Sequence, residues 1–197
     1  HLPFLQRILG GSDMSYQALT HLLSHQEHPI RAKTCNLLGN LLRHSHGFPQ
    51  VLQNQPGLLE SLLVCLADED EAVRKAASFA VGNAAYHESS PAGTLGRAVP
   101  RLTQLLSDRQ AKTRCNAASA LGNLGRRSAE LGELLIESGA PRILLEMACR
   151  DPQASVREGA LMALRAVSQH PGIQQVSALT RLMGQLVALR GWCRADC

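Results

Sequence analysis

Apolar residues recur along this chain at offsets of three and four, the spacing that places them on one face of an α-helix. The pattern is clearest in residues 71–86, which read EAVRKAASFAVGNAAY. Three further segments carry it and predict long helices over residues 28–44, 111–126 and 154–169. Their many alanines have high helix propensity and allow a neighbouring helix to approach closely.

Shorter apolar segments, separated by glycine and proline, lie ahead of each long segment. They predict short and medium helices over residues 2–9, 15–24, 48–53, 58–67, 99–106, 128–138 and 142–149. Residues 89–96 are rich in Ser, Pro and Gly and are predicted to form a loop. Residues 173–190 predict one last amphipathic helix.

The four long segments are degenerate copies of one another. Aligned on Arg31, Arg74, Arg114 and Arg157, they follow each other at steps of 43, 40 and 43 residues. Self-similarity at a period of about 40–47 residues is typical of HEAT and armadillo helical arrays. One short, one medium and one long helix per unit favours the armadillo variant, which has three helices in each repeat.

The fold prediction is therefore an all-α, right-handed, armadillo-type superhelical solenoid of about four repeats with three helices each. We expect an armadillo domain over residues 1–190, followed by a C-terminal tail. Its expected parts are repeats at 1–46, 47–88, 89–127 and 128–170, a capping helix at 171–190, and the tail at 191–197.

Charge and composition exclude several classes of protein. The net charge of +4 arises from 20 basic and 16 acidic side chains without a long Lys/Arg run, which makes nucleic-acid binding a minor alternative. No stretch approaches the ~18 apolar residues of a membrane span, and no signal peptide is visible. Because the chain starts at His1 without a methionine, we expect it to be part of a longer protein.

Six cysteines occur at irregular spacings without a CxxC pair. Cys65 and Cys149 align with leucine and alanine columns, which predicts small core side chains. With Cys35 and Cys115 they are expected to be free thiols of a reduced intracellular protein, with a disulfide scaffold as the alternative. Cys193 and Cys197 are expected to be exposed thiols in the tail.

The sequence offers little chemistry for catalysis or metal binding. His21, His25 and His28 have helical spacing, but no HExxH motif surrounds them, so solvated histidines are expected in preference to a zinc site. No phosphate-binding glycine loop, GxSxG elbow or kinase HRD or DFG motif is present. We therefore expect no cofactor, no metal and no enzymatic activity within this chain.

An aspartate lies six residues before the repeat arginine in three of the four copies. The pairs are Asp68 and Arg74, Asp108 and Arg114, and Asp151 and Arg157. Each aspartate is expected to lie in the turn and cap the long helix, with the arginine one turn further on. Stacked at the repeat period, these residues would form an ion-pair ladder that sets register more than stability, because exposed pairs contribute only ~0.2–1 kcal/mol each.

Two more columns of the long helices are informative. Gly39, Gly82 and Gly122 share a column, and glycine within a helix costs about 1 kcal/mol relative to alanine, so close helix contacts are expected there. The next column holds Asn40, Asn83 and Asn123. Each amide has two donor hydrogens and an acceptor, so this column either binds the backbone of an extended peptide or ties successive repeats together.

The glycine-asparagine pairs in CNLLGNLL (35–42), FAVGNAA (79–85) and SALGNLG (119–125) resemble the third-helix signature of armadillo repeats. Armadillo proteins of the importin and catenin type bind extended peptides along a concave groove, which this resemblance implies here. Importins carry a tryptophan four residues before the asparagine. These positions hold Asn36, Phe79 and Ser119, which are the candidate pocket residues beside the asparagines and depart from the importin pattern.

A narrower resemblance is to the C-terminal armadillo region of Fused-type serine/threonine kinases. It rests on KTCNLLGNLLRHS (33–45) and DEDEAVRKAASFAVGNAAYH (68–87). The resemblance implies a large cytoplasmic or ciliary parent whose kinase domain lies upstream. That family is tied to Hedgehog signalling and to building the central pair of motile cilia, through kinesin-like and axonemal partners.

The function expected from these resemblances is a protein-interaction scaffold that does not bind membranes. The alternatives are a purely structural element of the axoneme or cytoskeleton, and a transport-type adaptor that binds extended peptides.

Overall fold

The computed structural model describes residues 8, 16–45, 47–87 and 90–168, and in this part of the chain all regular structure is helical. The elements in order are α2 (Gln17–Leu23), α3 (His28–His44), α4 (Phe48–Asn54), α5 (Pro56–Val64), the 3₁₀ turn η1 (Cys65–Ala67), α6 (Glu71–Tyr86), α7 (Ala92–Gly96), α8 (Val99–Leu105), α9 (Ala111–Gly125), α10 (Ala129–Glu137), α11 (Ala140–Arg150) and α12 (Ala154–Ser168). The all-α prediction is confirmed.

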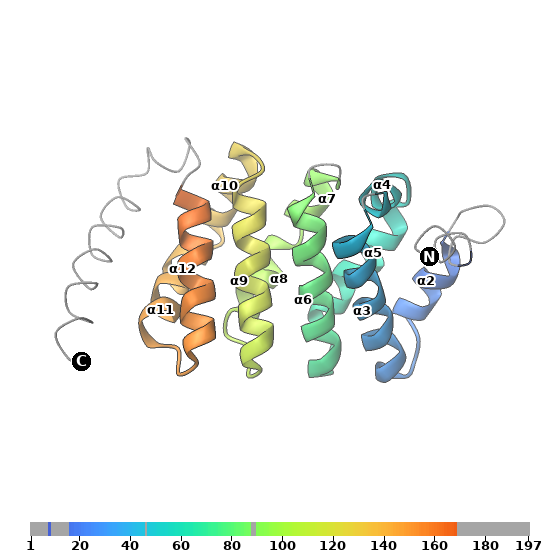
Figure 1. The fold of residues 1–197 in the computed structure, drawn as a ribbon, viewed down its shortest axis with the longest axis horizontal. Helices are drawn as coiled ribbons and strands as arrows, with labels where there is room; N and C mark the ends of the chain where they lie inside the picture. Colours follow the sequence, from blue (N-terminus) through green and yellow to red (C-terminus); the bar gives the residue numbers. More distant parts are fainter. Residues whose placement is uncertain (1–7, 9–15, 46, 88–89, 169–197) are drawn as a thin grey trace.

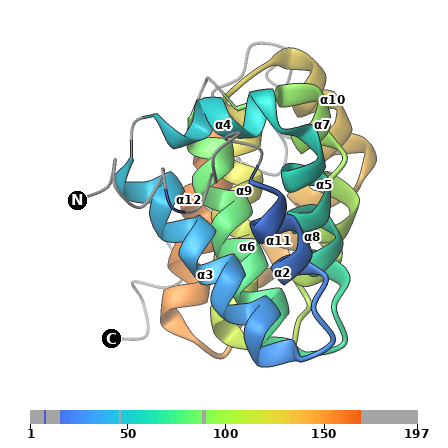
Figure 2. The same ribbon diagram turned by 90° about the vertical axis from the view of Figure 1, so that its right-hand side faces the viewer.

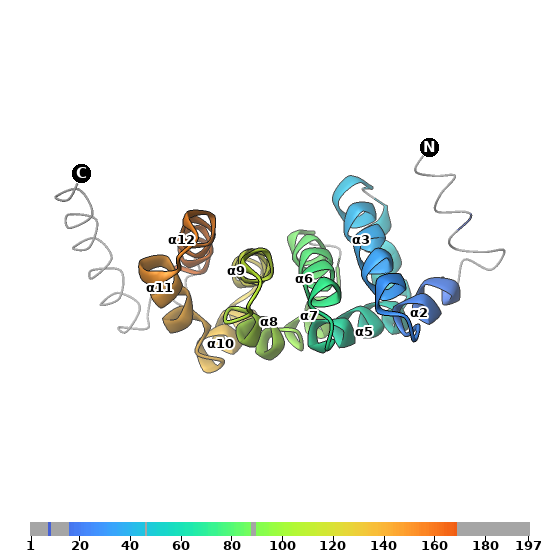
Figure 3. The ribbon, with the colours of Figure 1, turned by 90° about the horizontal axis from the view of Figure 1, so that it is seen from below.

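The long helices α3, α6, α9 and α12 stand side by side in one row (Figure 1). Helices α2, α5, α8 and α11 form a second row behind them, and the short helices α4, α7 and α10 lie at one end of both rows (Figures 1 and 2). Seen from below, the two rows curve, and the long helices lie on the inner side of the curve (Figure 3). The long helices therefore line the concave face of a helical solenoid.

The predicted apolar columns of the long helices lie in the core of the solenoid. The column of Leu38, Val81, Leu121 and Leu164 is buried, and so is the column of Thr34, Ala77, Ala117 and Ala160. Fully burying a leucine or valine side chain contributes about 1.5–3 kcal/mol, but in a solenoid this burial exists only while neighbouring units remain stacked. Each unit therefore depends on the next for its stability.

Local sequence signals explain where the helices begin. Proline occupies the first turn of α3, α4, α5, α8 and α11, where its fixed φ angle suits the helix and its missing N–H costs nothing. Asp70 caps α6, and Ser128 caps α10 by accepting the backbone N–H of Leu131. Gly139, with a φ of 73°, provides the left-handed residue that links α10 to α11.

The structure corrects one prediction about the third unit. Residues 89–96 were expected to form a loop, but residues 92–96 form helix α7, so this unit also has three helices. The reason is tertiary packing: Leu95 is completely buried, and Gly96 lies close to the side chains of Leu131 and Leu134. The helix predicted at 2–9, the capping helix at 171–190 and the tail at 191–197 fall outside the described residues apart from Ile8.

Candidate binding surface on the concave face

The exposed side of the long helices presents two adjacent columns. The central column consists of Asn36, Phe79, Ser119 and Met162, which are exposed except for the half-buried Phe79. The asparagine column consists of Asn40, Asn83 and Asn123, of which Asn40 is exposed and the other two are half-buried. We call these two columns together the concave strip, and they bring all six candidate peptide-binding residues onto one face.

Two asparagines of the strip tie successive units together. The Nδ2 atom of Asn83 donates to the carbonyl oxygen of Gly39 at 2.9 Å, and the Nδ2 atom of Asn123 donates to that of Gly82 at 2.9 Å. Each bond joins a long helix to the preceding one and uses one of the two amide hydrogens. The tie therefore fixes the orientation of the side-chain amide and leaves its second hydrogen outside this bond.

Asn116 and His87 make two similar ties between units that were not predicted. The Nδ2 atom of Asn116 donates to the carbonyl oxygen of Lys75 at 3.0 Å, and Nε2 of His87 lies 2.6 Å from the carbonyl oxygen of Leu42. Asn116 does not recur at its position in the other copies, so the alignment gives no signal for it. The position of His87 is histidine again at 44 and 170, a recurrence from which this column could have been found.

The repeat arginines and aspartates form an ion-pair ladder along the edge of the solenoid. Arg31, Arg74 and Arg114 each pair with the aspartate of the following unit, whereas Arg157 has bonds only to backbone carbonyls within the described residues. The Nε–Oδ2 distances are 2.7 Å for Arg31–Asp68, Arg74–Asp108 and Arg114–Asp151. Arg31 and Arg114 add a second bond from Nη2 to Oδ1, at 2.9 and 2.8 Å.

Each ladder arginine also anchors the turn that precedes its own helix. The Nη1 atom of Arg74 donates to the carbonyl oxygens of Asp68 and Glu69, at 2.9 and 2.8 Å. Arg31, Arg114 and Arg157 make equivalent bonds to the carbonyls five and six residues before them. The offset of six therefore reflects a bond to the aspartate backbone, while the aspartate side chain faces the preceding unit.

The expectation that these aspartates cap the long helices is wrong. Asp68 Oδ1 instead accepts the backbone N–H of Asp70, and Asp108 and Asp151 likewise accept the N–H two residues on. At α6 the cap is Asp70, whose Oδ1 accepts from Ala72 and Val73. The ladder aspartate lies two residues before the cap position, so its carboxylate closes the turn and remains available to the neighbouring arginine.

Ion pairing shifts the ionisation of the ladder residues. Hydrogen bonds from Arg114 hold the pKa of the Asp151 carboxyl below its usual range and raise the pKa of Arg114 itself. At Asp68, burial acts to raise the pKa, but the bonds from Arg31 and from the Asp70 backbone outweigh it, and the pKa is lowered. These shifts keep Asp68 and Asp151 charged near neutral pH.

The glycine column permits close helix approach, as expected, but unevenly. A Cβ atom on Gly122 would lie 3.0 Å from the Cα of Ala163, and one on Gly39 would lie 2.5 Å from the ring of Phe79. At Gly82 the nearest atom, the Cβ of Ala120, is 3.6 Å away, an ordinary van der Waals distance. A methyl group would therefore force Ala163 to shift at Gly122 and the Phe79 ring to move at Gly39, whereas Gly82 has room for one.

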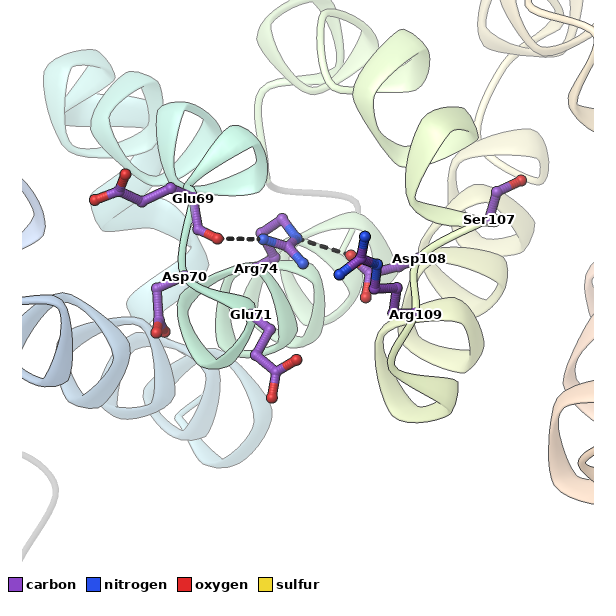
Figure 4. A pocket seen from close by; sticks show the side chains of 7 residues that line it. All are labelled: Glu69, Asp70, Glu71, Arg74, Ser107, Asp108 and Arg109. Atoms are coloured by element: carbon purple, nitrogen blue, oxygen red, sulfur yellow. Dashed lines mark hydrogen bonds and ion pairs between the residues drawn. The ribbon is translucent and has the colours of Figure 1, made fainter.

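A hollow of about 520 Å³ opens beside the middle pair of the ladder (Figure 4). It lies where the turns before α6 and α9 meet, and the bond between Arg74 and Asp108 crosses it. Its lining residues are Glu69, Asp70, Glu71, Arg74, Ser107, Asp108 and Arg109. Its charged side chains belong to the turns before α6 and α9 and to the first turn of α6, which the ladder bond holds together. The hollow is therefore part of the ladder and not a separate binding site.

The cysteines within the described residues are free thiols. Cys35 and Cys65 are buried, and their mutual hydrogen bond together with burial raises the pKa of the Cys35 thiol. The prediction that Cys149 belongs to the core is wrong, because its side chain is exposed. Helix α11 stays α-helical to its end, where the backbone N–H of Asp151 bonds to the carbonyl oxygen of Met147, whereas α5 tightens into the 3₁₀ turn η1. Cys149 therefore points in a different direction from the aligned residue of η1.

The histidine cluster does not converge on one point. His25 Nδ1 accepts the backbone N–H of Glu27, and His28 Nδ1 lies 3.1 Å from Asp70 Oδ2. Across the described ranges, no group of three metal-ligating side chains lies close enough to hold an ion. None of the helices that the structure describes has the length and apolar character needed to cross a bilayer.

Solved structures share this architecture. The designed armadillo repeat protein YIII(Dq)4CqI superposes with a TM-score of 0.74 at 24% identity, over 84% of this chain and 69% of that one. The designed armadillo repeat protein YIII(Dq.V1)4CPAF, solved in complex with peptide (KR)4, gives 0.75 at 23% identity, over 96% and 81%. These likenesses establish an armadillo-type solenoid fold.

The chain matches a small part of two long sequence relatives. It is 55% identical over 176 residues to serine/threonine-protein kinase 36 of Pongo abelii, and 52% identical over 176 residues to that of Mus musculus. In both cases the match covers 89% of this chain but 13% of the relative, so the chain is similar to a small part of each kinase. HEAT repeats match residues 59–165, which is more than half of the chain, and the chain therefore belongs to the HEAT-repeat family.

Proposed function

We propose that this chain is a protein-interaction segment whose concave strip binds an extended stretch of a partner protein. The observation that carries the proposal is the alignment of Asn36, Phe79 and Ser119 beside Asn40, Asn83 and Asn123 on one accessible face. The designed armadillo protein bound to peptide (KR)4 supports the proposal, because the same fold there accommodates a peptide.

The observed ties of the asparagines are compatible with peptide binding. Asn83 and Asn123 each commit one amide hydrogen to the preceding helix, and the second hydrogen remains for a ligand. A pre-oriented amide loses less conformational freedom when it binds, which favours affinity. Each backbone hydrogen bond contributes about 0.5–1.5 kcal/mol, so the asparagines set direction and register while the neighbouring side chains supply the remaining affinity.

The parent protein in this proposal is a Fused-type serine/threonine kinase, with the catalytic domain outside this chain. The 55% identity between this chain and serine/threonine-protein kinase 36, over 89% of the chain, supports this assignment. The proposed setting is Hedgehog signalling and assembly of the central pair of motile cilia, in the cytoplasm or the axoneme. Kinesin-like, axonemal or Hedgehog-pathway proteins are the proposed partners.

The test is to block the strip without disturbing the core. Ser119 is exposed, and its hydroxyl bonds only within α9, so Ser119→Trp adds bulk at the centre of the strip. Val64→Trp is the matched control, since Val64 is exposed on α5 in the other row. Proteins captured from ciliated-cell extract are compared by mass spectrometry, and thermal unfolding is followed for both variants.

Partners lost with Ser119→Trp and retained with Val64→Trp, at equal thermal stability, would support the proposal. The reverse result would favour the structural alternative, in which the outer face contacts the axoneme or cytoskeleton. The transport-type alternative requires that a basic nuclear-signal peptide bind, which isothermal titration with such a peptide decides directly.

A further inference from the structure

Cations that are scattered in the sequence gather beside the concave strip. Lys33, Lys75 and Lys112 lie in the first halves of α3, α6 and α9, and all three side chains are exposed. Arg43 lies near the end of α3 and Arg126 directly follows α9, again exposed. With a rise of about 1.5 Å per residue, the ten residues from Lys33 to Arg43 separate the two cationic rows by roughly 15 Å.

Unlike Arg31, Arg74 and Arg114, these side chains have no carboxylate partner among the described residues. Every ion pair found within the described residues involves the ladder, Arg97 with Glu60, or His28 with Asp70. Within the part of the chain that the structure describes, Arg126 donates to the side chain of Asn123. The positive charge of both rows is therefore not neutralised inside the solenoid.

Few acidic groups oppose this charge on the same face. Glu158 on α12 is exposed beside the strip, and Glu27 is exposed directly ahead of α3. At the start of α6, Asp70 caps the helix and pairs with His28, and Glu71 lies at the rim in the hollow beside the ladder. The concave face between α3 and α9 is consequently cationic, although the whole chain carries only +4.

We infer that the concave strip selects an acidic extended segment of a partner protein, an inference that rests on the proposed function. Neighbouring helices pack ~8–10 Å apart, so crossing four of them takes roughly 30 Å, or about ten residues of extended chain. Successive side chains of such a chain point in opposite directions. A segment lying over the asparagine column would therefore direct its carboxylates alternately toward the lysine row and the arginine row.

A nucleic acid would also match the charge, but the strip lacks its usual contacts. Single strands are bound by stacking their bases on repeated aromatic side chains. The central column instead presents Asn36, Ser119 and Met162 with the half-buried Phe79, whose ring packs against Gly39. Amides and small side chains suit a peptide backbone better than a stack of bases.

Fluorescence anisotropy with the full chain tests the inference. The probes are fluorescein-labelled peptides of about ten residues in which pairs of adjacent glutamates, glutamines or lysines alternate with pairs of serines, so that each extended peptide presents these side chains to both rows. We expect binding of the glutamate peptide alone, weakening as salt increases. The variant Lys33→Glu/Lys75→Glu/Lys112→Glu should weaken it roughly tenfold to a hundredfold, because attraction is replaced by repulsion.

The matched control is Arg101→Glu/Arg142→Glu/Arg150→Glu, which changes net charge equally at exposed positions on α8 and α11. It should change the affinity less than about threefold, since long-range charge effects are screened. Circular dichroism melts of both triple variants show whether the fold persists. Equal weakening by both variants would contradict a localised acidic-peptide site.

Three other results would also overturn the inference. Equal binding of the glutamine peptide would remove the role of charge. Binding of the lysine peptide, lost with Ser119→Trp, would leave the concave face as the binding surface but reverse its selectivity. Tighter binding of a single-stranded oligonucleotide, lost with the lysine reversals, would assign the strip to nucleic acid. The proposed function fails separately, if Ser119→Trp leaves partner capture unchanged.

Discussion

Removal of a single ladder carboxylate should uncouple neighbouring units. Asp151→Ala deletes the acceptor of two Arg114 bonds, at 2.7 and 2.8 Å, and of the Gln153 backbone N–H at 3.0 Å. The side chains of Arg114 and Asp151 are 13% and 6% exposed. Breaking a buried pair costs about 3–5 kcal/mol and breaking an exposed one about 0.2–1 kcal/mol. Arg114 keeps two backbone carbonyl partners, so we expect a loss of about 2–3 kcal/mol.

The assay is urea-induced unfolding at pH 7, followed by circular dichroism. Glu60→Ala is the matched control, because it removes a carboxylate from a pair with Arg97 whose side chains are 37% and 67% exposed. That variant should lose less than about 1 kcal/mol. A double-mutant cycle with Arg114→Ala isolates the pairwise coupling. If Asp151→Ala costs no more than Glu60→Ala, the ladder does not hold the units in register.

Two further predictions follow from the same contacts. Gly122→Ala should lower the free energy of unfolding by about 1–3 kcal/mol, because the new methyl group would meet Ala163. Gly82→Ala should be neutral or stabilising by up to about 1 kcal/mol, because a methyl group fits there. Thermal melts that show equal effects of the two variants would contradict this. The pKa of Asp151 is lower in the folded than in the unfolded chain, so its contribution to the free energy of unfolding is lost as the pH falls from about 3.9, the unfolded pKa, through the folded value. The difference in free energy of unfolding between wild type and Asp151→Ala should therefore narrow below about pH 5. A difference that widens would refute the pairing.

The sequence predicted the long helices closely because their signals are local and repeated. The structure places α6 at the predicted 71–86, where a strong apolar face coincides with a capping aspartate before the first residue. The buried leucine and alanine columns also followed from the periodicity, since a face that packs on a neighbour must recur once per unit.

Tertiary contacts explain the predictions that failed. Helix α7 has a loop-like composition and is held by burial of Leu95, which no local rule reveals. The ladder residues were found from their spacing, but the spacing suggested capping and could not show that the carboxylate faces the preceding unit. Cys149 was assigned to the core by alignment, although the end of α11 differs from that of α5 by its hydrogen-bond pattern.

The concave face shows a third kind of limit. Lys33, Lys75 and Lys112 are about forty residues apart in the chain, and they form a row only because the units stack. Charge counted along the sequence therefore looked small and dispersed. The asparagine column was recognised from the sequence, but its tie to the preceding glycine carbonyl became apparent only once α3, α6 and α9 were side by side.

Site-specific photo-crosslinking tests the central claim, partner binding on the concave face, most directly. A benzoylphenylalanine placed at Asn36 on α3 reports on the strip, and one placed at Val64 on α5 reports on the other row. Both positions are exposed, so both probes should leave packing intact. After irradiation in ciliated-cell extract, the account predicts a discrete partner adduct from position 36 and none from position 64. An adduct from position 64 alone would contradict it.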